Sequence, residues 1–381
     1  MWIIGTLTSL TLIVLLLVDA FETILQPRRV THRFRFARLF YRNTWKLWRA
    51  VGLWMRPGKR REAYLSIFGP LSLLGLFATW VIGLILGFGL LHASLGSAVA
   101  APEERATFLT YLYLSGTTFF TLGYGDVIPM TALGRGLTVA EAGLGFAFLA
   151  VTIGYLPVLY QAFSRREVTI SLLDARGGSP PSAAQILVRL ARAGNLVTLD
   201  SFLVEWERWS AELLESHLSF PVLSYFRSQH DNQSWLAALA SMLDTCAVLI
   251  AEVKSQSSYQ AQLTFAMARH AAVDLALVLK TPPSVPAADR LPDHERQRLR
   301  AQLRQAGLDL HAEAGTDARL TELRGMYEPF LGALARRFLF ALPPFVPDND
   351  MPDNWQRSAW MNRTPGIGSL PLASVDDAHF E

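Results

Sequence analysis

Two long apolar runs with few or no charged residues constrain the fold of this 381-residue chain more than any other feature. Between Glu62 and Glu103 there is no Asp, Glu, Lys or Arg, and residues 64–92 of that stretch are largely apolar. Residues 133–163 form a second run, in which Glu141 is the only charged residue after Arg135. About 20 apolar residues are enough for a helix to cross a bilayer. Both runs therefore predict transmembrane helices.

The amino-terminal residues 1–26 carry a third apolar run, which is either a cleaved signal peptide or a retained membrane helix. Val18 and Ala20 could flank a cleavage site, but no basic region precedes the apolar run as it does in a signal peptide. We interpret residues 1–26 as an uncleaved transmembrane helix with its amino terminus outside. Asp19 and Glu22, one turn apart near its inner end, are expected to pair with arginines at the membrane edge. The alternative is an intramembrane acid that senses protons or cations.

Residues 27–63 are strongly basic, and Glu62 is the only acid among them. Lys and Arg gather on the cytoplasmic side of membrane proteins, so this segment is expected to be cytoplasmic, and Arg165 and Arg166 mark the inner end of the last helix in the same way. The basic residues of the segment are Arg28, Arg29, Arg33, Arg35, Arg38, Arg42, Lys46, Arg49, Arg56, Lys59, Arg60 and Arg61.

Within this segment, residues 32–55 place their charges at a helical spacing with aromatic and aliphatic residues between them. The pattern predicts a basic amphipathic helix that lies in the cytoplasmic headgroup layer and binds anionic lipids. A voltage-sensing helix is the alternative, but the segment has too little apolar length to cross a bilayer and only one helix precedes it.

Between the two uncharged runs, residues 107–120 are apolar but too short to cross, and they lead directly into Thr121-Leu122-Gly123-Tyr124-Gly125-Asp126. Non-helical backbone at membrane depth is tolerated only where it is buried in protein or lines a water-filled cavity. A short re-entrant helix followed by a loop is therefore expected here. The loop resembles the selectivity filter of potassium channels, T-[VIL]-G-Y-G-D, at every position.

The resemblance covers residues 64–163 and implies a pore built by a homotetramer in the cell membrane. In that family, backbone carbonyls of the filter replace the water shell of K⁺, so Thr121, Leu122, Gly123, Tyr124 and Gly125 are the expected ion-binding residues. The hydroxyl of Thr121 would add a ligand, and the side chains of Leu122 and Tyr124 would brace the loop from outside. Asp126 would lie at the outer mouth. Potassium ions in the filter are expected, and no organic cofactor.

Four residues around the filter depart from the commonest family pattern. Phe120 stands where threonine or serine is usual, Tyr113 with Leu114 where tryptophans are frequent, and Thr117 where some members have glutamate. Tyr113, Thr117 and Phe120 are expected to support the filter. In particular, we expect Tyr113 to donate a hydrogen bond to Asp126.

On the last membrane helix, Gly143, Gly145 and Pro157 are candidates for a gating hinge, because glycine and proline are known causes of helix kinks. The alternative is that Gly143 and Gly145 only allow close packing of helices, which small residues favour in membranes.

Residues 164–342 predict a helical cytoplasmic domain, followed by a tail rich in Pro and Asp at residues 343–381. The glycine fingerprint of the Rossmann-type regulatory domains of many similar channels is missing. Cys246 lies in an apolar helical run and is expected in the core. Amphipathic or apolar helices are predicted at 199–220, 235–253, 259–279, 290–305 and 320–342.

A polar cluster around residues 227–233, together with the preceding His217, offers His217, His230 and Asp231 as candidates for a metal site. The alternative, which we favour, is a solvated turn in which Asp231 caps the next helix. The spacing of these residues matches no specific metal motif.

The sequence as a whole predicts an all-α membrane protein with three transmembrane helices, a re-entrant pore helix with its filter, and a helical cytoplasmic domain. The expected function is potassium-selective conduction, gated by that domain. A less selective cation channel, or a membrane-anchored sensor or scaffold with a silent pore, are the alternatives. No catalytic constellation indicates an enzyme. The net charge of +3 averages a basic segment and a mildly acidic domain, which makes nucleic acid an unexpected partner.

Overall fold

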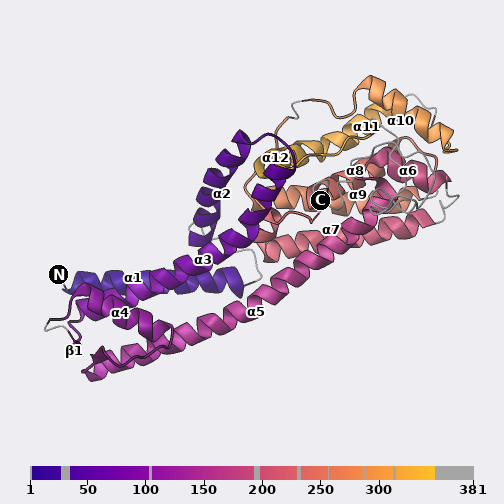
Figure 1. The fold of residues 1–381 in the computed structure, drawn as a ribbon. Helices are drawn as coiled ribbons and strands as arrows, with labels where there is room; N and C mark the ends of the chain where they lie inside the picture. Colours follow the sequence, from indigo (N-terminus) through magenta and orange to yellow (C-terminus); the bar gives the residue numbers. More distant parts are fainter. Residues whose placement is uncertain are drawn as a thin grey trace, which may run out of the picture. The chain divides into compact units, whose positions relative to one another are not determined.

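The structure is a computed structural model, and it describes residues 2–26, 35–102, 105–192, 198–229, 233–255, 257–285, 288–311 and 315–347. Helices dominate this part of the chain, and the one sheet found there pairs two strands of two residues each (Figure 1). The predicted all-α fold is confirmed.

The elements follow one another in the order α1 (Trp2–Ile24), α2 (Phe36–Trp54), α3 (Lys59–Ser94), β1 (Val99–Ala100), α4 (Phe108–Phe119), β2 (Ile128–Pro129), α5 (Ala132–Gly177), α6 (Ala183–Arg192), α7 (Leu199–Ser219), η2 (Pro221–Tyr225), α8 (Trp235–Ala251), α9 (Ser258–Val278), α10 (Asp293–Gln305), α11 (Thr316–Gly325) and α12 (Glu328–Phe338).

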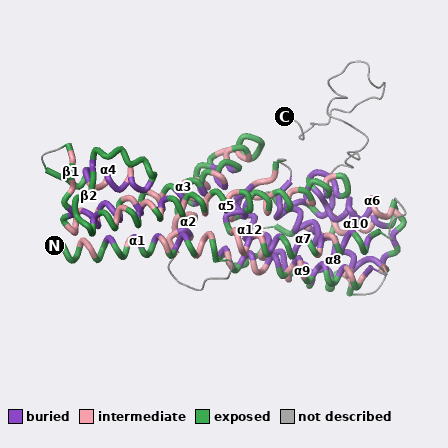
Figure 2. The backbone as a smooth tube through the Cα atoms, turned by 90° about the horizontal axis from the view of Figure 1, so that it is seen from below, coloured by how far each residue is buried: buried purple, intermediate pink, exposed green. Residues whose placement is uncertain are grey.

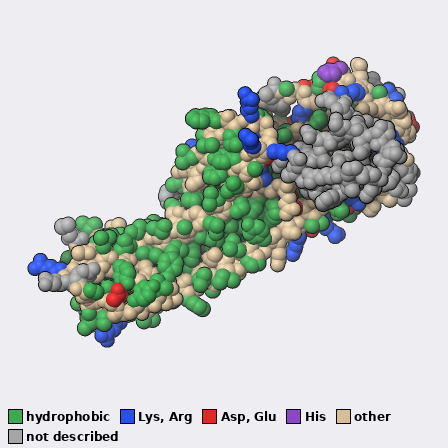
Figure 3. Space-filling model, in the orientation of Figure 1, with side chains coloured by type: hydrophobic (Ala, Val, Ile, Leu, Met, Phe, Trp, Pro, Cys, Tyr) green, Lys and Arg blue, Asp and Glu red, His purple; other side chains and the backbone are tan. Residues whose placement is uncertain are grey.

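Helices α1, α3 and α5 are long and apolar enough to cross a membrane. Many large hydrophobic side chains of these helices are exposed, and hydrophobic side chains are spread over this part of the surface in Figure 3. The three predicted spans are therefore confirmed as helices. Helix α5 continues to Gly177, well beyond the predicted end of its span at residue 163, because nothing between Ser164 and Arg176 interrupts a helix.

The chain divides into two compact units. The first unit contains Met1–Trp54 and Ile67–Gln161, and the second contains Met55–Ser66 and Ala162–Glu381. Helices α3 and α5 each contribute residues to both units, since the boundaries fall inside them.

In the first unit, Asp19 joins three helices. Its buried carboxylate accepts hydrogen bonds from the Ala37 amide near the start of α2, at 3.0 Å, and from the Trp80 indole of α3, at 3.0 Å. Neutral donors therefore hold the Asp19 carboxylate, and Arg28 and Arg29, with which it was expected to pair, lie outside the described residues. Glu22 does pair with an arginine, since its carboxylate lies 3.7 Å from Arg35.

The predicted basic helix forms over α2, and residues 27–34 lie outside the described part of the chain. Its buried Trp45 packs edge-on against Phe68 of α3, with ring centroids 4.8 Å apart. The apolar side chains Leu47, Val51 and Trp54 are exposed, and Trp54 is 92% exposed.

The second unit is built around α8, which is buried on all sides (Figure 2). A helix that is hydrophobic all round is the expected centre of a helical core. Helix α9 packs against both α7 and α8. Cys246 of α8 is fully buried as predicted, and burial raises the pKa of its thiol.

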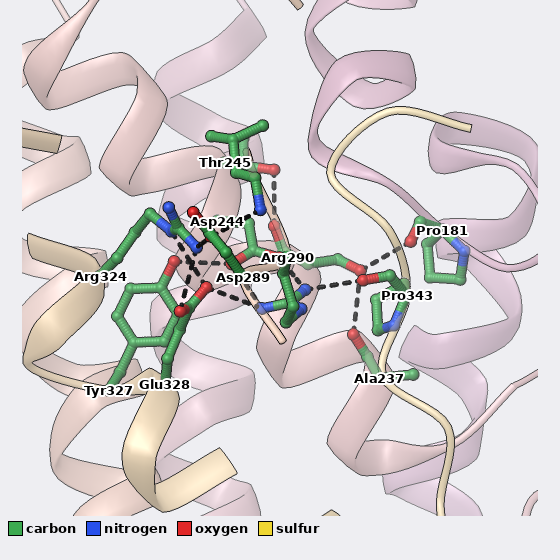
Figure 4. A network of polar contacts seen from close by, with 12 residues as sticks. Pro181, Ala237, Asp244, Thr245, Asp289, Arg290, Arg324, Tyr327, Glu328 and Pro343 are labelled. Carbon is green, nitrogen blue, oxygen red and sulfur yellow. Dashed lines mark hydrogen bonds and ion pairs between the residues drawn. The ribbon is translucent and has the colours of Figure 1, made fainter. Parts of the chain in front are cut away.

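A network of ionic groups crosses this core (Figure 4). Asp244 of α8 accepts hydrogen bonds from Arg290, at 2.6 Å, and from the hydroxyl of Tyr327, at 2.6 Å. Arg290 also donates to the carbonyl of Pro343 at 2.7 Å, and Arg324 donates to Glu328 at 3.1 Å. Burial of charges is tolerated when each is paired and hydrogen-bonded, as it is here.

The helix predicted at 320–342 is wrong, because two helices, α11 and α12, occupy this stretch. Pro329 stands in the first turn of α12, where its missing N–H costs nothing, but it could not continue a helix from α11. Leu339 adopts a left-handed conformation with a φ of 57° and ends α12 before the predicted boundary. The other four predicted helices form as α7, α8, α9 and α10, whereas α6 was not expected.

Candidate functional site

The short helix predicted at residues 107–120 is present as α4. Its amino terminus is closed by a capping box between Thr107 and Thr110. Strand β1, which precedes α4, pairs with β2, which follows the loop, and the hydroxyl of Tyr111 donates to the carbonyl of Ser97 at 2.9 Å. These contacts fix both ends of the segment that contains α4 and the loop after it.

The loop that follows α4 is held by carbonyls of that helix. The amide of Thr121 donates to the Thr118 carbonyl at 2.9 Å, and the amide of Leu122 donates to the Thr117 carbonyl at 2.7 Å. The amide of Gly123 also reaches the Thr117 carbonyl, at 3.4 Å. The end of α4 therefore sets the start of the loop.

Within the loop the backbone is left-handed at every second residue. The φ angles are 55° at Thr121, 57° at Gly123 and 79° at Gly125. When left-handed residues alternate with others in this way, successive peptide groups point in the same direction. The amides then lie on one side of the loop and the carbonyls on the other. Glycine adopts these angles without steric cost, whereas Thr121 does so at some cost.

The outer end of the loop is tied to α4 through Asp126. The Tyr113 hydroxyl donates to Asp126 Oδ2 at 2.8 Å, which confirms the predicted hydrogen bond, and the Val127 amide donates to Asp126 Oδ1 at 3.1 Å. The hydroxyl of Thr117 instead bonds within α4, to the carbonyls of Tyr113 and Leu114, both at 3.0 Å. Thr117 thus contacts the loop through its carbonyl and not through its side chain.

The side chains that flank the loop are exposed in the single chain. Phe120 is 58% exposed, Leu122 is 54% and Tyr124 is 70%. Large apolar side chains exposed at a loop of defined geometry are typical of a surface that another molecule covers.

Gly145 and Gly143 of α5 differ in their surroundings. A Cβ on Gly145 would lie 2.0 Å from the carbonyl oxygen of Phe119, at the end of α4, whereas a Cβ on Gly143 would meet nothing within 4 Å. Close packing therefore accounts for Gly145. Pro157 lies inside the continuous helix α5.

Comparison with known proteins agrees with this geometry. A family model described as an ion channel matches residues 76–161. Protein LctB of Bacillus caldotenax is 36% identical over 93 residues, which are 22% of this chain and 69% of that protein. The chain belongs to this ion-channel family.

LctB of Geobacillus stearothermophilus is 34% identical over 93 residues, again 69% of that protein. An uncharacterised membrane protein of Bacillus subtilis (strain 168), YdjJ, is 24% identical over 199 residues, which are 50% of this chain. The chain covers 58% of the length of YdjJ. No solved structure matches it significantly.

In the second unit, a buried arginine of α5 contacts the η2 segment and the residue after it. The guanidinium of Arg166 donates to the carbonyls of Leu223 and Phe226, both at 3.0 Å, and lies 5.1 Å from the centre of the Phe163 ring. Its own carbonyl accepts the indole N–H of Trp209 at 3.2 Å. The η2 segment is thereby attached to α5.

The same segment is attached to the start of α3 by Arg227. Its guanidinium forms an ion pair with Glu62 and donates to the carbonyl of Phe338, and it stacks on Phe340 at 4.3 Å from the ring centre. Residues 220–227 therefore contact both α3 and α5, and we call them the clasp. The sequence had suggested Arg166 only as an orientation signal and Arg227 only as part of a polar turn, since neither set of contacts is local in the chain.

His217 is buried beside Arg166. Its Nε2 accepts from Arg166 Nη1 at 3.2 Å, and its Nδ1 donates to the Leu213 carbonyl at 2.8 Å. Burial, and then the charge of Arg166, hold the pKa of His217 well below its ordinary value. Both ring nitrogens thus have partners other than a metal. His230 and Asp231 lie outside the described residues, and the described part contains no group of three metal-ligating side chains.

Proposed function

We propose that this channel conducts K⁺ selectively through a homotetrameric pore whose filter is the Thr121–Gly125 loop. The observation that carries the proposal is the backbone itself: left-handed angles at every second residue, in a loop anchored to the carbonyls of α4. Such a loop turns its carbonyl oxygens to one side, and a ring of them can replace the water shell of a K⁺ ion.

In this proposal each filter residue has a defined part. The carbonyls of Thr121 through Gly125 line the path, the Thr121 hydroxyl adds a ligand at the inner end, and Asp126 lies at the outer mouth. Tyr113 holds Asp126 through its hydrogen bond, and Thr117 holds the loop through its carbonyl. Phe120 caps the end of α4 and joins that helix to the loop. The potassium ion is the transported cargo, and conduction involves no catalytic step.

Exposed side chains support assembly. Leu122 and Tyr124 flank the loop without cover in the single chain, and Val139, Phe146 and Ile153 of α5 are more than 60% exposed. The last three recur every seven residues, so they share one face of α5. Copies of the chain arranged around a common axis would cover the sides of the filter loops.

Charge supports the orientation. The second unit begins with the basic residues around Arg56 and Arg61, which the positive-inside rule places in the cytoplasm of a protein in the plasma membrane. The amino terminus would then be outside and the second unit cytoplasmic. Helix α2 combines exposed Arg42, Lys46 and Trp54, and we propose that it binds anionic lipid headgroups.

The clasp supports gating by the second unit. Arg166 and Arg227 attach one short segment to α5 and to α3, the two helices that continue into the first unit on either side of α4. A rearrangement of the second unit that moves the clasp would displace both helices together. The proposal is that this displacement opens and closes the pore.

The experiment is ion flux from liposomes that contain the purified full chain. We expect K⁺ flux without comparable Na⁺ flux. Gly123→Asp should abolish it, because Asp puts a charged side chain beside the filter backbone. Thr131→Asp is the matched control, since Thr131 caps the Gly134 amide at 3.1 Å and aspartate can replace it there. This control should keep the flux.

Two results would overturn the proposal. Equal K⁺ and Na⁺ flux that Gly123→Asp removes would indicate the less selective cation channel. No flux of either ion, with a correctly folded chain, would indicate a sensor or scaffold with a silent pore.

A further inference from the structure

Glu141 is a carboxyl group that ion conduction as proposed above does not use. It lies on α5 and is fully buried in the first unit. Its side chain contacts Ser115 of α4, which is also fully buried. Charged or acidic residues inside membrane segments are costly and are kept for a function.

The number of protons available for these hydrogen bonds indicates whether Glu141 is protonated. Ser115 Oγ lies 2.9 Å from the carbonyl oxygen of Ile85 in α3, and it also lies within hydrogen-bond distance of Glu141 Oε1. A serine hydroxyl has one proton to donate, and the Ile85 carbonyl has none. Each contact is a separate two-centre hydrogen bond only if Ser115 donates to Ile85 and Glu141 donates to Ser115. Glu141 must then carry a proton.

The remaining oxygen agrees with a neutral acid. Glu141 Oε2 is buried and has no hydrogen-bond partner among the described residues. A carboxylate without a compensating partner is far more costly to bury than a neutral carboxyl group. The neutral form leaves only a carbonyl oxygen unpaired.

The contact joins three helices close to the filter. Ile85 belongs to α3, Ser115 to α4 and Glu141 to α5. Two residues after Ser115, the carbonyl of Thr117 holds the amides of Leu122 and Gly123. We propose that Glu141 is a neutral carboxylic acid that positions α4, and through it the filter loop. The protonation state stands on the geometry alone, whereas the positioning role rests on the proposed function.

Infrared difference spectroscopy of the purified full chain tests the protonation state without any ion flux. The spectrum of the wild type minus that of Glu141→Gln should contain the C=O stretching band of a protonated carboxylic acid. The band should shift in Ser115→Ala and stay in place in Ser72→Ala. Ser72 is the matched control, because it is a buried serine of α3 whose hydroxyl donates within its own helix, to the Gly69 carbonyl. An absent band, or one that Ser115→Ala does not shift, overturns the proposal.

Ion flux then tests the positioning role. Glutamine is neutral and can donate a hydrogen bond, so Glu141→Gln should keep the K⁺ preference of the wild type. Glu141→Ala leaves the hydroxyl of Ser115 without its second partner and should lower the K⁺ over Na⁺ preference about tenfold. If Gln and Ala reduce the preference equally, the positioning role is wrong. A wild type without K⁺ flux would refute the proposed function but leave the infrared result valid.

Discussion

At the scale of single residues, glycines serve two different physical needs in this channel. Gly123 and Gly125 have positive φ angles and open space around their Cα atoms, so their requirement is conformational. Gly145 has ordinary helical geometry, but the Phe119 carbonyl occupies the place of a side chain. Its requirement is steric, and it concerns the contact of α5 with the end of α4.

The pair Gly145 and Gly143 gives a prediction with a built-in control. Gly145→Ala should destabilise the folded chain by about 1–3 kcal/mol, because a backbone carbonyl cannot move aside as a flexible side chain can. Gly143→Ala should leave the stability unchanged or slightly higher, since alanine favours helices. Thermal unfolding in detergent, followed by tryptophan fluorescence, measures both.

Equal destabilisation by the two alanines would contradict the packing account. A Gly143→Ala variant with normal stability but altered gating would instead assign the hinge to Gly143.

At the scale of elements, the clasp is a segment of the second unit that binds both α3 and α5. Arg227 should couple to Glu62 more strongly than a surface pair does, because its side chain is only 7% exposed. Breaking one partner leaves the other charge buried without compensation. The exposed pair of Arg176 and Glu205, at 3.4 Å, is the matched comparison.

We predict that Arg227→Gln and Glu62→Gln, alone and combined, give a coupling energy of about 1–3 kcal/mol in thermal unfolding. The corresponding cycle on Arg176 and Glu205 should give less than about 1 kcal/mol. In liposomes, Arg227→Gln should change the rate of K⁺ flux but not the K⁺ over Na⁺ preference. A changed preference with an unchanged rate would mean that the clasp acts on the filter and not on gating.

Much of this architecture follows from local sequence. The length of the apolar runs predicted α1, α3 and α5, and helical periodicity predicted α7 to α10, because these signals lie within each element. The loop after α4 and the hydrogen bond between Tyr113 and Asp126 could also be predicted, because the resemblance to a known family indicates which residues surround that loop.

Other features depend on contacts between residues far apart in the chain, which periodicity does not report. The Asp19 bond to Trp80, the clasp and the contact of Ser115 with Glu141 are of this kind. Glu141 did leave a local signal, as the lone carboxylate of an apolar run. The break between α11 and α12 also had a signal in Pro329, which the apolar pattern of that stretch obscured.

At the scale of the whole molecule, α3 and α5 are the two helices that belong to both units. The first unit holds the loop that is proposed to select the ion, and the second holds the clasp that is proposed to control when it passes. Selectivity and gating should therefore respond to different substitutions. The expectation that these substitutions have separate effects depends on the loop being a working potassium filter.

The reversal potential of the full chain in a planar bilayer tests that central claim most directly. With K⁺ on one side and Na⁺ on the other, the account predicts a current that reverses far from zero, on the side set by K⁺ permeation. Gly123→Asp should remove this current. A wild-type current that reverses near zero would contradict the account, because a ring of filter carbonyls should not pass both ions equally.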